Sequence, residues 1–261
     1  MAASRGRRPI SSTRSAARSE PGTPVPDARP AGEGAEDPRF HGRRQGRRLR
    51  AGQKRLIDEL LPAVAVSAAD APRCADPAGL FGRPVDDVWL EIGFGAGEHL
   101  AGQAARHPAV GFIGAEPFVN GVARLLAQIE ERGLGNVRIL ADDVRPLLAA
   151  LPPGCLGRVF ILFPDPWPKT RHHQRRIVNR GVLDQLAAAM RPGAELRLAT
   201  DDGGYLRWML RELLAHPAFE WTARSAADWR QRPADGVETR YERKNRSGGF
   251  GPVYLGFRRR D

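Results

Sequence analysis

The chain of 261 residues has little cysteine and no long apolar run, and both absences narrow its class. Its two cysteines, Cys74 and Cys155, can form neither a disulfide framework nor a metal site made of cysteine alone. We therefore expect a reducing compartment and a cytoplasmic protein. No segment reaches the roughly 20 consecutive apolar residues that a membrane-spanning helix needs, so we expect no association with a membrane.

Positive charge is in excess, and it is concentrated near the N-terminus. The chain holds 41 Lys and Arg residues against 30 Asp and Glu residues. Residues 1–55 contain 14 basic and 5 acidic residues, whereas residues 56–261 contain 27 basic and 25 acidic residues. Residues 1–38 have almost no large apolar side chain, so they cannot offset the entropy of ordering. The sequence predicts a disordered basic tail over 1–38 and a single domain over 39–261. Such a tail can bind an anionic polymer through phosphate contacts.

From residue 88 onward, short apolar segments alternate with helical patterns. Strands are predicted at 88–92, 110–115, 137–140, 158–163, 196–200, 219–222 and 253–257. Helices are predicted at 49–64, 98–106, 119–132, 176–190 and 205–215, with a proline-rich connector at 70–84. This alternation indicates an α/β fold in which helices cover both faces of a parallel sheet.

Each of the five predicted parallel strands ends in an acidic residue or a glycine-rich turn. In open α/β sheets, ligands bind beyond the carboxyl ends of the strands. We expect one edge of the sheet to carry Glu91, Gly93, Gly95, Gly97, Glu116, Asp142, Asp165 and Asp201.

The glycine-rich turn suits a nucleoside ligand, although a plain tight turn is the alternative. Its G-x-G-x-G spacing differs from the dinucleotide pattern G-x-G-x-x-G, and Glu98 places a carboxylate where a pyrophosphate would rest. A sulfonium ligand tolerates that charge. Glu116 can accept hydrogen bonds from ribose hydroxyls, and Asp142 can accept one from an adenine amino group. These features favour S-adenosylmethionine over NAD.

The fourth predicted parallel strand continues into the sequence FPDPWPK, in which three prolines hold Asp165 stiffly. Trp167 offers a flat face for a base. Residues 169–176 add four cations and two histidines, a pattern that suits a nucleic-acid backbone, although a solvated basic loop is the alternative. His172 and His173 lack partners at zinc-site spacing, so we expect no metal.

The chain also contains longer motifs: VWLEIGFGAGEHL, FIGAEP, ILFPDPWPKTRHHQRRIVN, LATD and ETRYE. Together they resemble the tRNA (guanine-N7-)-methyltransferase family over about residues 40–260. The resemblance implies a Rossmann-like class I methyltransferase fold: a mainly parallel seven-stranded sheet with helices on both faces and an antiparallel C-terminal strand. It also implies methyl transfer from S-adenosylmethionine to N7 of guanosine 46 in tRNA.

The resemblance assigns roles to individual residues. It implies cofactor contacts at Glu91, Glu116 and Asp142, beside the loop of Gly93, Gly95 and Gly97, and a catalytic role for Asp165. Substrate contacts are implied at Asp165, Lys169, Asp201, Thr239, Arg240, Tyr241 and Glu242. The last four residues depart from the family's Thr-Lys-Phe-Glu at two positions. The arginine-rich segment 46–53 resembles a family motif and is expected to order on RNA.

The implied roles agree with what methyl transfer to guanine N7 requires. Guanine N7 carries a lone pair and no proton, so its methylation needs alignment rather than a general base. A fixed carboxylate such as Asp165 can stabilise the cation that develops on the purine. We expect tRNA as the partner and a monomer or homodimer. Three alternatives stay open: an NAD-dependent oxidoreductase, an RNA-binding protein with an inactive methyltransferase fold, and a small-molecule methyltransferase.

Overall fold

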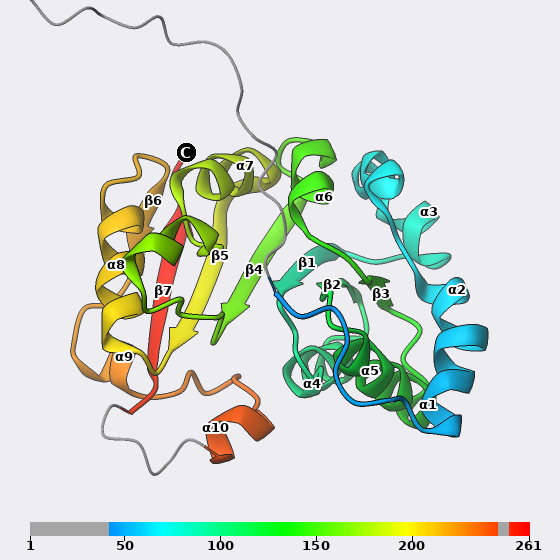
Figure 1. The fold of residues 1–261 in the computed structure, drawn as a ribbon. Helices are drawn as coiled ribbons and strands as arrows, with labels where there is room; N and C mark the ends of the chain where they lie inside the picture. The colour runs from blue at the N-terminus through cyan, green and yellow to red at the C-terminus, as the bar shows by residue number, and fades with distance from the viewer. Residues whose placement is uncertain (1–41, 245–250) are drawn as a thin grey trace, which may run out of the picture. The chain divides into compact units, whose positions relative to one another are not determined.

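The computed structural model describes residues 42–244 and 251–261, so the predictions for residues 1–38 lie outside the described part (Figure 1). Within the described residues, no helix has both the length and the apolar character that crossing a bilayer requires.

A seven-stranded sheet forms the centre of the fold, in the order β3-β2-β1-β4-β5-β7-β6. The strands are β1 (Asp87–Ile92), β2 (Val110–Ala115), β3 (Val137–Leu140), β4 (Leu156–Leu162), β5 (Met190–Thr200), β6 (Phe219–Trp221) and β7 (Val253–Arg259). Strands β1 to β5 pair in parallel, and β7 runs antiparallel to both β5 and β6. The predicted sheet, with its antiparallel C-terminal strand, is confirmed.

Helices cover both faces of the sheet, as predicted (Figure 1). In β1 the side chains alternate: Val88 and Leu90 join one core, whereas Trp89 joins the other. The Trp89 face packs against the π-helical turn η1 (Leu56–Leu60), α2 (Leu61–Val64), α4 (Glu98–Arg106) and α5 (Val119–Arg132). Helix α1 (Ala51–Arg55) has no buried residue, and its Arg55 pairs with Glu130 of α5 at 2.7 Å. The other face packs against η2 (Ala68–Ala75), α3 (Pro77–Phe81), α6 (Arg145–Ala150), α7 (Arg180–Ala189) and α8 (Gly203–Leu214).

The chain between β6 and β7 contains two short helices, α9 (Ala227–Arg230) and α10 (Arg240–Lys244). Neither helix is among the elements that the sequence predicted. Four- and five-residue helices carry too few residues for an amphipathic period to be recognised.

Two N-terminal predictions need correction. The expected helix over 49–64 is divided by η1, because Pro62 has no N–H to donate to the carbonyl four residues earlier. The expected connector over 70–84 holds η2 and α3. Ser67 and Asp70 form a capping box at the start of η2, with the Ser67 N–H donating to Asp70 Oδ2 at 2.9 Å.

The expected boundaries at 176–196 also shift. Helix α7 begins at Arg180 because the Asn179 side chain accepts the N–H of Val182 at 3.1 Å and caps it. Strand β5 starts at Met190 rather than at 196, and Pro192 and Gly193 therefore lie inside an irregular strand instead of ending the helix.

Candidate active site

A cavity of about 560 Å³ opens at the carboxyl ends of β1, β2, β3 and β4. Three acidic residues lie in its wall: Glu116 after β2, Asp142 after β3 and Asp165 after β4. The turn after β1 contributes Gly93 and Gly95. The structure thus brings together five of the eight residues expected at this edge. The remaining lining is Gly42, Arg43, Ile92, Ala115, Pro117, Phe118, Asp143, Val144, Arg145, Phe163, Pro164, Trp167, Arg175, Ile177 and Tyr241.

The other three expected residues lie outside the cavity lining. Gly97 is the N-cap of α4, with a φ of 80°. Glu91 is buried in β1, and its Oε2 lies 2.7 Å from His99 Nδ1 on α4. Asp201 follows β5 and accepts a hydrogen bond from the Tyr241 hydroxyl at 3.2 Å. Gly97 and Glu91 therefore contact the elements that form the cavity without lining it. Asp201 is connected to the cavity only through Tyr241, which lines it.

The turn after β1 presents bare backbone to the cavity. Gly93 and Gly95 adopt φ values of 74° and 58°, in the left-handed region that favours glycine. A Cβ added at either position would meet no atom within 4 Å, so the space above both residues is open to a ligand.

Glu116 connects this turn to the end of β2. Its Oε2 accepts the N–H of Gly95 at 2.8 Å, and its Oε1 accepts the N–H of Phe118 at 2.9 Å. Burial raises the pKa of Glu116, these two hydrogen bonds oppose the rise, and the charges of Asp165 and Glu91 add to it. Each carboxylate oxygen keeps a second lone pair, so Glu116 can still accept from hydroxyls of a ligand.

An N-terminal strap, residues 42–50, runs beside the cavity. Arg44 Nη2 lies 2.8 Å from Asp142 Oδ1, and the Arg44 carbonyl accepts the N–H of Val119 at the start of α5. The Gly46 N–H donates to Asn120 Oδ1, and Asn120 Nδ2 donates to the Arg47 carbonyl, both at 2.7 Å. Part of this segment was expected to order on RNA, but its place beside Asp142 was not predicted. The one signal in the sequence is the arginine-rich motif itself.

The loop over residues 163–168 has a strained backbone. Phe163 and Trp167 adopt φ values of 51° and 43°, which cost about 1–3 kcal/mol each for residues other than glycine. The Arg176 guanidinium donates to the carbonyl oxygens of Pro166 at 2.9 Å and Trp167 at 3.4 Å. These two hydrogen bonds hold the loop in its strained conformation. Asp165 is exposed at the cavity wall between these two strained residues.

The residues of the basic run 169–176 differ in their surroundings. Arg176 is buried and supports the loop. His172 and His173 pack edge-on against Trp167 and Trp208, with ring centroids 5.9 and 5.3 Å apart. Lys169 is exposed and lies outside the cavity lining. Contact of this run with RNA stays a prediction, and the buried Arg176 is the residue of the run least available for it. Among the described residues, no three His, Cys, Asp or Glu side chains gather as metal ligands.

The segment Thr239-Arg240-Tyr241-Glu242 is also divided. Tyr241 lines the cavity, with its ring centroid 5.2 Å from that of Phe163. Thr239, Arg240 and Glu242 are absent from the cavity lining. Thr239 and Glu242 instead cap each other: the Thr239 N–H donates to Glu242 Oε2 at 2.7 Å, and the Glu242 N–H donates to Thr239 Oγ1 at 3.2 Å.

Glu242 is fixed by further partners in the interior. Arg232 Nε donates to its Oε1 at 3.0 Å, and the Tyr254 hydroxyl donates to the same oxygen at 2.5 Å. Burial alone would raise the pKa of Glu242, but the hydrogen bonds from Thr239, Tyr254 and Arg232 hold it below its usual value. Glu242 therefore supports α10 rather than facing the cavity.

Comparison with known proteins agrees with this architecture. Residues 86–253 match the model of a family described as "Putative methyltransferase". A tRNA (guanine-N(7)-)-methyltransferase of Rhodospirillum rubrum is 56% identical over 228 residues, which cover 86% of this chain and 89% of the relative. The chain belongs to this methyltransferase family.

Other similar proteins support the same assignment. A tRNA (guanine-N(7)-)-methyltransferase of Paramagnetospirillum magneticum is 52% identical over 87% of this chain and 94% of its own length. Among solved structures, the 16S rRNA methyltransferase KamB aligns with a TM-score of 0.51 and 19% identity, over 72% of this chain and 94% of that protein. The likeness to KamB concerns the fold alone.

Proposed function

We propose that this family member transfers a methyl group from S-adenosylmethionine to N7 of a guanosine in tRNA, at position 46 of the variable region. One observation carries the proposal: the glycine turn, two strand-end acids and Asp165 share one cavity. The relatives' names supply the tRNA and the guanine N7, and the position comes from the resemblance in the sequence. Neither the oxidoreductase nor the inactive RNA-binding alternative gains support from these relatives.

The residues present fit the cofactor. The open space above Gly93 and Gly95 admits a ligand against the backbone. Glu116 would accept hydrogen bonds from the ribose, and Asp142 would accept one from the adenine amino group. Gly97 and the buried Glu91 would hold the turn in shape. When bound, S-adenosylmethionine supplies a methyl group activated by the sulfonium.

Asp165 would orient the guanine and stabilise it. Its carboxylate can accept hydrogen bonds from guanine N1–H and the 2-amino group, which fixes the direction of N7. Positive charge develops on the purine as N7 is alkylated, and a carboxylate held by a stiff loop stabilises this charge without reorganising. Because N7 carries no proton, Asp165 need not act as a base.

Other residues would hold the tRNA. Lys169 is exposed and suited to a phosphate contact, which positions RNA without reading its sequence. Trp167 and Tyr241 present aromatic rings at the cavity for stacking on a base. The hydroxyl of Tyr241 is directed by Asp201. Because position 46 lies in the folded core of tRNA, we expect local opening of the base before transfer.

The test is the substitution Asp165→Ala. We expect methyl incorporation into unmodified tRNA to be abolished, because alignment and charge stabilisation both fail. Binding of S-adenosylhomocysteine should stay within a few-fold of the unmodified protein's value, since the cofactor contacts are elsewhere in the cavity. Unchanged turnover in the variant would contradict the role of Asp165. Absence of any methylated guanosine with the unmodified protein would contradict the function itself.

A further inference from the structure

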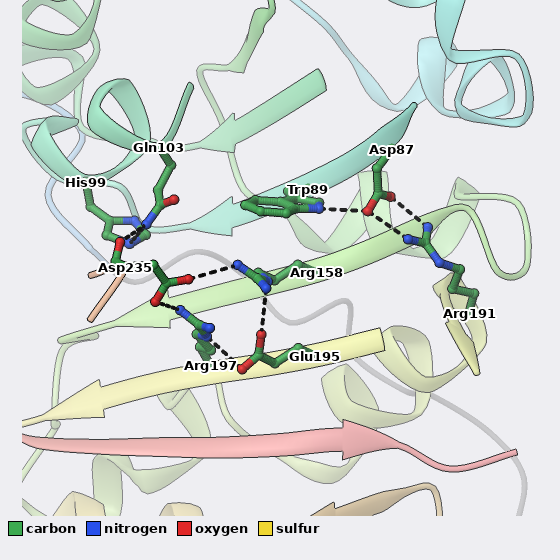
Figure 2. Close-up of polar contacts among 9 residues, drawn as sticks. All are labelled: Asp87, Trp89, His99, Gln103, Arg158, Arg191, Glu195, Arg197 and Asp235. Carbon is green, nitrogen blue, oxygen red and sulfur yellow. Dashed lines mark hydrogen bonds and ion pairs between the residues drawn. The ribbon is translucent and has the colours of Figure 1, made fainter. Parts of the chain in front are cut away.

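A polar network lies on the face of the sheet that carries Trp89 (Figure 2). None of its residues lines the cavity described above. Its centre is Asp235, which lies in the connection between α9 and α10. Arg197 Nη1 donates to Asp235 Oδ1 at 2.6 Å, and Arg158 Nη1 lies 3.3 Å from Asp235 Oδ2. Glu195 pairs with both arginines, at 3.0 and 2.8 Å. The network thus links β4 and β5 to a segment outside the sheet.

The main chain of Asp235 is held as well as its side chain. Gln103 Nε2 donates to the Asp235 carbonyl at 2.7 Å, and Arg106 Nη1 donates to it at 2.9 Å. Four side chains from α4, β4 and β5 therefore converge on one residue. Residues 231–239 contain no helix or strand, so their position depends on contacts of this kind.

The residues after Asp235 transmit its position to α10. A Cβ added to Gly102 of α4 would lie 2.8 Å from Val237, which shows how closely this segment approaches the helix. Arg232 then bonds both Glu238, at 3.3 Å, and Glu242, at 3.0 Å. With the capping box at the start of α10, these contacts form a continuous path from Asp235 to the helix that carries Tyr241.

The same network also reaches the strand that precedes the glycine turn. Gln103 Nε2 lies 3.3 Å from His99 Nε2, and His99 Nδ1 lies 2.7 Å from Glu91 Oε2. Glu91, however, is held in the middle of a sheet with β2 and β4 on either side. Removal of the Asp235 carboxylate should therefore displace α10 much more than β1.

We propose that Asp235 is a positioning residue for the tRNA substrate: its contacts with Arg158, Arg197 and α4 hold α10 so that Tyr241 faces the cavity. This inference rests on the proposed function. Without the Asp235 carboxylate, Arg158 and Arg197 share the single charge of Glu195, and two partly buried guanidinium groups have one acceptor fewer. The released segment then holds α10, and with it Tyr241, less firmly.

A bidentate ion pair elsewhere on the same sheet supplies a control (Figure 2). Asp87, the first residue of β1, accepts from Arg191 at 2.7 Å on both oxygens and from Trp89 Nε1 at 2.8 Å. It lies at the opposite end of β1 from the glycine turn, and these partners belong to β1 and β5 rather than to the 231–239 segment. Asp87→Asn therefore removes an ion pair but none of the hydrogen bonds of Asp235. Its one link to the network is the Trp89 ring, whose centroid lies 4.1 Å from the Arg158 guanidinium carbon.

The experiment compares Asp235→Asn with Asp87→Asn in the full-length protein. For Asp235→Asn we expect kcat/KM for tRNA to fall about tenfold, because displacement of a positioning residue misaligns the substrate. The Kd for S-adenosylhomocysteine should stay within twofold. For Asp87→Asn we expect the melting temperature to fall without a change in KM for tRNA. Equal reductions of kcat/KM in the two variants, or an unchanged value in Asp235→Asn, would overturn the proposal.

Two further measurements keep the proposal separate from general destabilisation and from the proposed function. In a Tyr241→Ala background, Asp235→Asn should have little further effect on kcat/KM, because it acts through the residue already removed. Additive effects would overturn the proposal. Hydrogen exchange of the peptide containing 236–244 should be faster in Asp235→Asn and unchanged in Asp87→Asn, whether or not tRNA is the substrate. Unchanged exchange in Asp235→Asn would overturn the inference about position, whereas failure of methylation with the unmodified protein would overturn only the function.

Discussion

Glu116 combines a structural and a binding role in one side chain. Its two oxygens already hold the N–H groups of Gly95 and Phe118, which fixes the glycine turn against the end of β2. The same carboxylate lies in the cavity wall, where burial raises its pKa. A ligand that donates hydroxyl groups to Glu116 favours the ionised form, so binding and ionisation are linked.

The linkage predicts how cofactor affinity depends on pH. Hydroxyl donors stabilise the carboxylate, so affinity is greatest above the pKa of free Glu116 and weakens as pH falls through it. Because burial raises that pKa, the weakening should begin at a higher pH than for an ordinary glutamate. Titration calorimetry with S-adenosylhomocysteine measures the Kd at each pH. Glu116→Gln should bind more weakly and show a flatter profile; an equally steep profile in that variant would contradict the assignment.

At the scale of residues, three of the five acids expected at this edge of the sheet line the cavity, and Glu91 and Asp201 do not. Glu116, Asp142 and Asp165 could be placed together because each follows a parallel strand, and such strands end at one edge. The burial of Arg176 and Glu242 could not be predicted. Both are charged residues in motifs with other exposed charges, and only tertiary contacts determine which of them turn inward.

At the scale of elements, the approach of α5 to the glycine turn provides a test. A Cβ added to Gly121 in the first turn of α5 would lie 2.2 Å from the carbonyl oxygen of Gly95. Gly121→Ala should therefore displace the turn, although alanine favours a helix over glycine by roughly 1 kcal/mol. We expect the Kd for S-adenosylhomocysteine to rise by about tenfold, which corresponds to about 1.4 kcal/mol.

The C-terminal end of the same helix supplies the control for Gly121→Ala. Gly133 ends α5 with a φ of 62°, and a Cβ added there would meet no atom within 4 Å. Gly133→Ala should lower the free energy of unfolding by roughly 1–2 kcal/mol through backbone strain, with cofactor affinity unchanged. If both variants bound cofactor equally well, the close approach of α5 to the glycine turn would not matter for binding.

The elements themselves were predictable where an apolar period was long enough. The strands over 110–115 and 137–140 and the helices over 98–106 and 119–132 have the bounds that the sequence indicated. The errors concern short or irregular elements. Helix α6 has six residues and begins beside a proline, and α10 has five, so neither shows a full amphipathic period.

At the scale of the whole molecule, the distribution of charge suggests how tRNA is held near the cavity. Residues 1–38 contain six basic and five acidic residues, whereas residues 39–55 contain eight basic and no acidic residues. The second segment includes the N-terminal strap, in which Gly42 and Arg43 line the cavity and Arg44 pairs with Asp142. The strap therefore brings positive charge to the edge of the site, while 1–38 adds little net charge.

This difference predicts the salt dependence of tRNA binding. Removal of residues 1–38 should weaken binding mildly and reduce the slope of log K against log salt slightly. Arg47→Gln with Arg48→Gln, both exposed in the strap, should weaken binding more, and the slope should fall by roughly 0.7–0.9 for each phosphate that is no longer neutralised. Filter binding across a salt series gives both values, with S-adenosylhomocysteine binding as the control for an intact cavity. Complete abolition of tRNA affinity on removing 1–38, or an unchanged slope in the double variant, would assign the main tRNA interaction to the tail instead of the strap.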